Sequence, residues 1–177
     1  MDKVLVVWTR IILWIVLLGL LTGCAATPGE AYQLDIDPGF NSTQQVDIVA
    51  AVQDWEDHVP VHFKIDVKAC SGSRAHQVCI HPGDPAQHGA GGPASGWCAL
   101  NWGTDGGEIW LSQSAPLQQS ATHELGHAMG LKHQGPGTEE YCASPIVMAP
   151  LPETAATTVQ VGDVAQWYTV RHQVMPP

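Results

Sequence analysis

Hydrophobic and polar residues recur along this chain with two different periods, and these periods predict its elements. Between residues 42 and 59, apolar side chains recur every three or four positions among acidic ones, which is the period of an amphipathic helix. The apolar positions are Val46, Val49, Val52, Trp55 and Val59. Ser42 or Thr43 is placed to cap this helix, and the helix is predicted to end before Pro60.

A strict alternation follows this first helix. Apolar residues occupy every second position from Val61 to Val67, so this segment is predicted to form a half-buried strand with His62 on its exposed side. Shorter strands are predicted near residues 78–80, 96–102 and 108–112, because each of these runs is bounded by Gly or Pro. Residues 81–96, rich in Gly and Pro, are predicted to form a long loop.

Two further helices are predicted in the second half of the chain. Ser114 before Ala115-Pro116 is typical of an N-cap with Pro in the first turn, which predicts a helix over residues 115–129. Its apolar side is formed by Leu117, Ala121, Leu125 and Ala128. Residues 157–172 also show near-helical spacing, with Asp163 near the start, and this tail helix is expected to serve packing.

The first residues carry the features of a targeting segment. Lys3 and Arg10 precede an apolar run over residues 11–21, which is shorter than the ~20 residues that span a bilayer. Residues 1–23 are therefore predicted to be a signal peptide, and Leu21-Thr22-Gly23-Cys24 resembles the bacterial lipoprotein box, which implies lipidation of Cys24. The alternative is an uncleaved anchor helix over residues 4–21, in which Arg10 would cost about 2.5 to 3.5 kcal/mol at the bilayer centre. Both versions predict an extracytoplasmic protein held at a bacterial membrane.

The rest of the chain has room for one domain. The 177 residues suffice for a single core, and residues 24–41, which lack periodicity, are predicted to be a flexible spacer before a domain over residues 42–177. Without residues 1–23, which hold Asp2, Lys3 and Arg10, 16 acidic residues stand against 5 basic ones, a formal charge of −11. Such a surface repels nucleic acid and anionic headgroups and favours neutral or basic polypeptides as partners.

Four cysteines remain beyond Cys24, an even number in a chain expected in an oxidising compartment. They predict two disulfides, for which three pairings are possible. We favour Cys70 with Cys79 and Cys98 with Cys142.

The strongest chemical signal is the run from His123 to His133. In a helix, His123 and His127 lie one turn apart on the same face and can reach one metal ion, with Glu124 placed beside a water on that ion. Gly130 can adopt the left-handed conformation that ends a helix, which would return His133 as a third ligand. Three ligands leave one coordination position for water, as in catalytic zinc sites.

This run resembles the metzincin signature, His-Glu-x-x-His-x-x-Gly-x-x-His, at each defined position. The resemblance implies an α+β fold with a small mixed twisted sheet, an N-terminal helix, a zinc-binding helix, a Met-turn and a C-terminal helix. It also implies a catalytic Zn²⁺, peptide hydrolysis with Glu124 as the base, and a monomeric enzyme. Met148, followed by Pro150, resembles the Met-turn of matrixins, one branch of this family.

The same resemblance suggests two further sites. Glu108, Ile109, Trp110 and Leu111 stand where metzincins place the edge strand that pairs with an extended substrate; the alternative is an ordinary edge strand. Matrixins carry structural zinc and calcium in a comparable loop, so His81, Asp84 and His88 could hold a second Zn²⁺ or Ca²⁺, although loop histidines are more often solvated.

Two classes of function are therefore expected. The first is a lipid-anchored zinc endopeptidase that acts on extracytoplasmic proteins, and the second is a non-catalytic zinc-binding surface lipoprotein. Glu124 favours the enzyme, because zinc storage has no use for a carboxylate beside an open coordination site.

Overall fold

A five-stranded sheet with helices on one face forms the part of the chain that the computed structural model describes. The described residues are 29–70, 72, 74–88, 96–100, 105–132 and 158–171, with backbone alone for residues 97–100. In chain order the elements are β1 (Glu30–Ile36), α2 (Ser42–His58), β2 (Val61–Val67), β3 (Gln77–Pro82), the short 3₁₀ helix η1 (Pro85–Gln87), β4 (Gly96–Leu100), β5 (Gly107–Leu111), α3 (Leu117–Ala128) and α4 (Val161–Val170).

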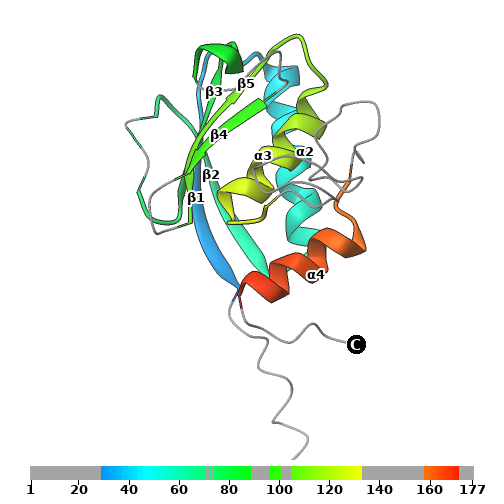
Figure 1. The fold of residues 1–177 in the computed structure, drawn as a ribbon. Coiled ribbons are helices and arrows are strands. Elements are labelled where there is room, and N and C mark those ends of the chain that lie inside the picture. Colours follow the sequence, from blue (N-terminus) through cyan, green and yellow to red (C-terminus); the bar gives the residue numbers. More distant parts are fainter. Residues whose placement is uncertain are drawn as a thin grey trace, which may run out of the picture.

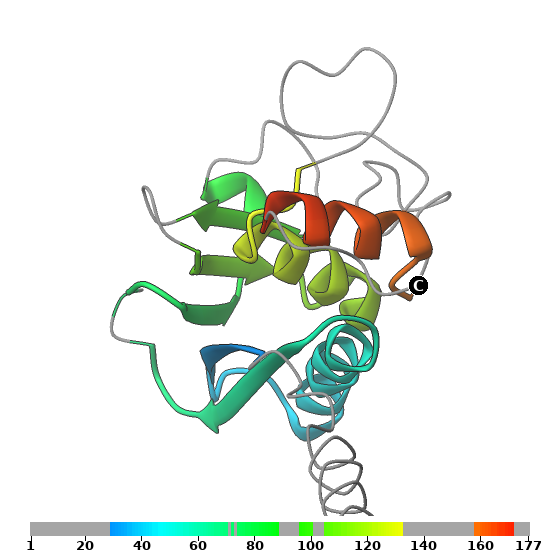
Figure 2. The ribbon, with the colours of Figure 1, turned by 90° about the horizontal axis from the view of Figure 1, so that it is seen from below.

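The strands lie in the order β2-β1-β3-β5-β4. The first four run parallel, and only β4 is antiparallel to its neighbour β5. Parallel neighbours need a crossover connection, and α2 supplies the one between β1 and β2. Helices α2 and α3 pack side by side on the same face of the sheet, and α4 lies beside the C-terminal end of α3 (Figures 1 and 2). The molecule therefore has a mixed α/β fold with a small sheet, as predicted.

The prediction of a flexible spacer over residues 24–41 is wrong for residues 30–36. Residues 30–36 form β1, which pairs with β2 on one side and β3 on the other. Its buried positions Tyr32, Leu34 and Ile36 alternate with polar ones, which is the signal of a strand. The prolines and glycines at both ends of this short run hid that alternation, because they are typical of loops.

Helix α2 forms where it was predicted but is capped and oriented differently. Its N-cap is Asn41, whose side chain accepts a hydrogen bond from the backbone N–H of Gln44, while the backbone N–H of Asn41 donates to the side-chain oxygen of Gln44. Val46 and Val49 are exposed, contrary to prediction. The helix buries its stripe at Ile48, Ala51, Val52 and Trp55 instead. Strand β2 agrees with prediction at both ends, with His62 exposed.

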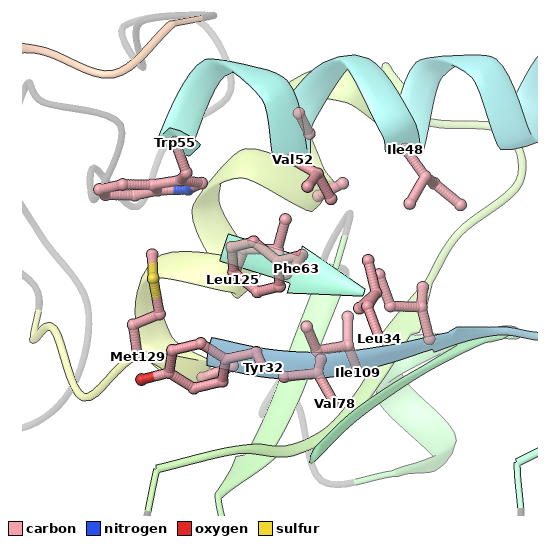
Figure 3. Packing of buried hydrophobic residues seen from close by; sticks show 14 of the residues in the cluster. Tyr32, Leu34, Ile48, Val52, Trp55, Phe63, Val78, Ile109, Leu125 and Met129 are labelled. Atoms are coloured by element: carbon pink, nitrogen blue, oxygen red, sulfur yellow. The ribbon is translucent and has the colours of Figure 1, made fainter. Parts of the chain in front are cut away.

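The core lies between the helices and the inner face of the sheet. Figure 3 shows Ile48, Val52 and Trp55 of α2 and Leu125 of α3 pointing toward Leu34 and Ile109 of the sheet. These side chains are at most 1% exposed. Burial on this scale stabilises the fold by about 1.5 to 3 kcal/mol for each large side chain. The core fixes α3 against the sheet, and α3 carries the candidate site.

The tail of the chain forms α4, as predicted, over a shorter range. Asp163 is at its third position and accepts a hydrogen bond from the backbone N–H of Gln160, in a capping box. Trp167 is the large residue that α4 buries. Within the described ranges, every helix is too short or too polar to cross a membrane.

Candidate active site on helix α3

Helix α3 presents two histidines on one face and buries a glutamate between them in sequence. The rings of His123 and His127 meet edge to face, with centroids 4.8 Å apart and an interplanar angle of 83°. Both histidines are partly exposed, whereas Glu124 is 6% exposed. Two imidazoles at this spacing can bind one ion from the solvent side, so this part of the predicted site is brought together.

The chain after His127 turns in a way that fixes the ring of this histidine. The carbonyl oxygen of Leu131 lies 2.9 Å from His127 Nδ1. A carbonyl can only accept, so Nδ1 carries the proton and the ring lone pair resides on Nε2, the nitrogen suited to a metal. This is the usual support that a backbone carbonyl gives a metal-binding histidine. The residues that the structure describes therefore fit a zinc ion.

Gly130 makes that turn possible. Its φ is +82°, in the left-handed region, as predicted from the sequence. The backbone N–H of Gly130 donates to His127 O at 2.8 Å, and the N–H of Leu131 donates to Gly126 O at 2.9 Å. This pair of bonds is a Schellman motif, which ends the helix and reverses the chain.

Burial sets the protonation of Glu124. Removal of its carboxyl group from water raises the pKa of Glu124 to about 8. Gly96, the first residue of β4, faces this side chain. A Cβ added at Gly96 would lie 2.7 Å from Cγ and 2.8 Å from Oε1 of Glu124. The outer strand of the sheet thus passes directly beside the carboxyl group.

The middle and the C-terminal end of α3 are anchored by long-range hydrogen bonds. Trp55 of α2 donates from Nε1 to the carbonyl of Thr122, which lies in the middle of the helix directly before His123, at 2.8 Å. At the C-terminal end, Arg171 donates from Nη1 to Met129 O at 2.7 Å, and the N–H of Gly106 donates to Ala128 O at 2.7 Å. The histidines therefore stand on a helix with little freedom to shift.

The start of α3 differs from prediction. The helix begins at Leu117 with Pro116 at the N-cap position, where no side chain accepts a hydrogen bond. Ser114 instead shares a hydrogen bond with Ser112, at 2.9 Å between hydroxyl oxygens. The N–H of Ala115 donates to Ser112 O, so these residues form a separate turn before the helix.

The prediction that residues 108–111 form an edge strand is wrong. They belong to β5, which pairs with β3 on one side and β4 on the other. Among the described strands, β4 is the outer one on this side of the sheet. Strand order depends on pairing between distant segments, and the distance from the histidine motif alone could not distinguish β4 from β5.

Several predicted site residues lie outside the described residues. These are His133, Met148, Cys24 and Cys142. Cys98 lies on β4, where the structure describes the backbone only. The third zinc ligand, the Met-turn, the lipidation site and the second disulfide stay predictions.

The three residues of the predicted second metal site have separate contacts in the structure. Asp84 accepts a hydrogen bond from the N–H of Ala86 and so caps η1, and the ring of His88 stacks on Trp110 with centroids 4.3 Å apart. His81 instead lies beside Cys70 and Cys79, in a cluster whose possible ligand atoms are all within 4.8 Å of one another.

Cys70 and Cys79 are unbridged thiols in the structure. The disulfide predicted between Cys70 and Cys79 is therefore not formed in the structure, although the two residues are neighbours. Burial raises the pKa of both thiols, so neither is an activated thiolate suited to nucleophilic catalysis.

Sequence reasoning missed two residues that the site uses. Gly96 was assigned to the Gly-rich loop and a strand end, and its approach to Glu124 depends on tertiary packing. Arg171 follows α4 and reaches Met129 across 42 positions of sequence. In the sequence, Arg171 stands out only as one of few basic residues in an acidic chain, and this does not indicate which residues it contacts.

Comparison with known proteins finds a similar fold among the solved structures. No family model matches the sequence, and no curated protein matches it. The structure is similar to that of high choriolytic enzyme 1, a hatching enzyme zinc-protease from Oryzias latipes (medaka fish), with a TM-score of 0.55, 10% sequence identity, and coverage of 85% of this chain and 93% of that chain. At this identity the likeness concerns the fold, so the fold of this chain resembles that of a zinc protease.

Proposed function

We propose that this protein is a zinc-dependent endopeptidase of the metzincin type. The observation that carries the proposal is the arrangement on α3: two histidines on one face, a buried glutamate next to the first, and a left-handed glycine that reverses the chain three residues before His133. The likeness to a zinc-protease fold supports it. His123, His127 and His133 would hold the ion.

The residues of the site divide the chemistry between them. A bound zinc ion polarises a carbonyl group and acidifies a water molecule. Glu124 accepts the proton of the attacking water and then delivers it to the leaving amine. The buried position of Glu124 suits this exchange, because a carboxyl group whose pKa is raised toward neutrality can act both as base and as acid.

Strand β4 is the better candidate for substrate binding. Among the strands that the structure describes it is the outer one, and Gly96 places its backbone against Glu124. An extended polypeptide that adds to the outer side of β4 would pass the base in the strand-addition mode of recognition. This role replaces the one first expected for residues 108–111.

A cleavage assay tests the proposal. The purified protein is incubated with an unfolded generic protein, with and without a chelator, beside Glu124→Gln and the control Asp57→Asn, which changes an exposed carboxylate of α2. We expect cleavage by the wild type and by the control, loss with chelator, and a fall of about 10² to 10⁴ in Glu124→Gln.

Zinc content decides between the two expected functions. If the wild type and Glu124→Gln bind equal zinc and neither cleaves any substrate, the protein is a non-catalytic zinc-binding protein. An unbiased peptide library would then define the side-chain preference of an active enzyme.

A further inference from the structure

The outer face of the sheet, away from α2 and α3, carries a cluster of metal-binding side chains. Cys79 and His81 lie two positions apart on β3 and so share a face, alternating with the core residues Val78 and Ile80. Cys70 reaches the same point from the segment that follows β2, and its thiol donates to the carbonyl of Asp35 at 3.4 Å. The ligand atoms of the two cysteines and the histidine all lie within 4.8 Å of one another.

We propose that Cys70, Cys79 and His81 form a second, structural Zn²⁺ site, separate from the one on α3. Two sulfurs that bind one tetrahedral zinc ion at about 2.3 Å stand about 3.8 Å apart, so the observed spacing needs only small side-chain movements. Two thiolates with an imidazole are the donors that zinc prefers over calcium or magnesium.

The surroundings of His81 support this assignment independently. Its Nε2 atom is buried and has no hydrogen-bond partner in the described part of the chain. A buried polar atom without a partner is costly, and a bound ion would satisfy it. On the other side of the ring, Nδ1 faces Asp37 Oδ2 at 3.9 Å, in the place of the carboxylate that commonly orients a zinc-binding histidine.

Glu108 is a candidate for the fourth position. It stands opposite Cys79 in the register of β3 and β5, and its Oε2 lies 3.9 Å from His81 Nε2. That separation is too long for a hydrogen bond but is of the order expected for two ligands of one ion. Asp37 and Glu108 both face the ring of His81 and give this cluster a negative charge that favours a cation.

The expected role of this second zinc site is to stabilise the fold. An ion held by Cys70 and by two residues of β3 would fasten the segment between β2 and β3 to the sheet. Removal of this ion should lower the thermal stability of the protein and leave the helix with His123 and His127 in place.

Cobalt substitution tests the proposal without reference to peptidase activity. The protein is purified under reducing conditions, stripped with a chelator and titrated with Co²⁺. We expect a thiolate-to-cobalt charge-transfer band, which the histidines of α3 cannot produce. The band should be absent in Cys70→Ser/Cys79→Ser and strongly weakened in His81→Ala. It should be retained in the matched control His88→Ala, which changes the other histidine stacked on Trp110.

Zinc content and thiol chemistry complete the test. The wild type as isolated should hold one more equivalent of zinc than the double variant, whether or not the α3 site binds zinc, and its two thiols should resist alkylation until chelator is added. A wild type lighter by two hydrogens, with Cys70 joined to Cys79 by a disulfide, would overturn the proposal. Equal metal content and equal cobalt spectra in the wild type and His81→Ala would overturn it as well.

Discussion

Glu124 is a carboxyl group that the fold holds almost out of contact with water, next to two partly exposed histidines. Its side chain lies against Gly96 of the outer strand, so its position depends on a residue 28 positions earlier in the sequence. At the scale of single residues, both the charge and the placement of this carboxyl group can be tested.

The charge of Glu124 predicts a pH dependence of stability in the metal-free protein. Because burial raises its pKa from 4.5 to about 8, the folded protein binds more protons than the unfolded chain between these values, and the free energy of unfolding should fall as pH rises through this range. Glu124→Gln should remove this contribution, on the order of a few kcal/mol, and so be more stable than the wild type at pH 8. Urea denaturation of both proteins at pH 5 and pH 8, with chelator, measures this contribution. If the free energy of unfolding changes equally between pH 5 and pH 8 in the wild type and in Glu124→Gln, the prediction is contradicted.

The placement of Glu124 predicts the effect of Gly96→Ala. The new methyl group would lie within 3.1 Å of three atoms of the glutamate, so the carboxyl group must move. A displacement of about 1 Å at a catalytic group can cost about 100-fold in rate, so kcat should fall by that order while the thermal midpoint changes little. Gly83→Ala is the control, because a Cβ there meets only ordinary contacts. Equal rates in both variants would show that β4 does not constrain Glu124.

The histidine motif could be predicted from the sequence because its geometry is local. Residues four apart on a helix share a face whatever the helix packs against, and a glycine after the last turn favours the left-handed conformation. The structure agrees for His123, His127 and Gly130. The cluster at Cys70 could not be predicted in this way, since its members meet only after β3 has paired with its neighbours.

At the scale of elements, one residue ties α4 to the rest of the site. Arg171, with its side chain 7% exposed, donates to the Glu30 carboxylate on β1 and to the hydroxyl of Tyr32. It also pairs with Asp105 and donates to Met129 O at the end of α3. Four separate segments therefore meet at one guanidinium group.

Loss of that group should destabilise the fold. Arg171→Met leaves the carboxylates of Glu30 and Asp105 without their cation, and breaking such a pair from one side costs about 3 kcal/mol. Lys64→Met, on the exposed side of β2, should change stability by less than about 0.5 kcal/mol. Denaturant midpoints of the two variants measure the difference. Similar midpoints would show that the network adds nothing to stability.

Helices and strands could be predicted from the sequence where only one of their faces is buried. The alternation from Val61 to Val67 gave β2 its bounds, because one side of that strand meets the core and the other meets water. Helix α2 had the correct extent, but neighbouring valines with the same spacing competed for the buried stripe, and only the packing against α3 and the sheet selected Ile48 over Val46. The strand β1 was missed because its flanking Pro and Gly residues dominated a short pattern.

At the scale of the whole molecule, the acidic surface and the N-terminal segment concern where the protein works. Cys24 and the residues before it lie outside the described residues, so the lipid anchor is our proposal. An anchor of more than one acyl chain holds a protein stably, because each buried CH₂ contributes about 0.8 kcal/mol.

Cys24→Ala should release the protein from the membrane. When the full-length chain is expressed in a bacterium, we expect the wild type in the membrane fraction and in the detergent phase of a phase-separation assay. The variant should lose its acyl mass and leave the detergent phase. A wild type without acyl mass that stays in the membrane would instead identify residues 4–21 as an uncleaved anchor.

The sequence by itself determined the spacing of the two histidines and the glutamate, the glycine that ends their helix, the strand β2 and the acidic charge, since each of these follows from neighbours along the chain or from composition. Tertiary structure decided that β4 and not β5 is the outer of the described strands, that β1 joins the sheet, and that Gly96 meets Glu124. It also gathered Cys70, Cys79 and His81 on the outer face. The physical reason is that backbone pairing and burial join segments far apart in sequence, and no local periodicity records which distant partner a strand will take.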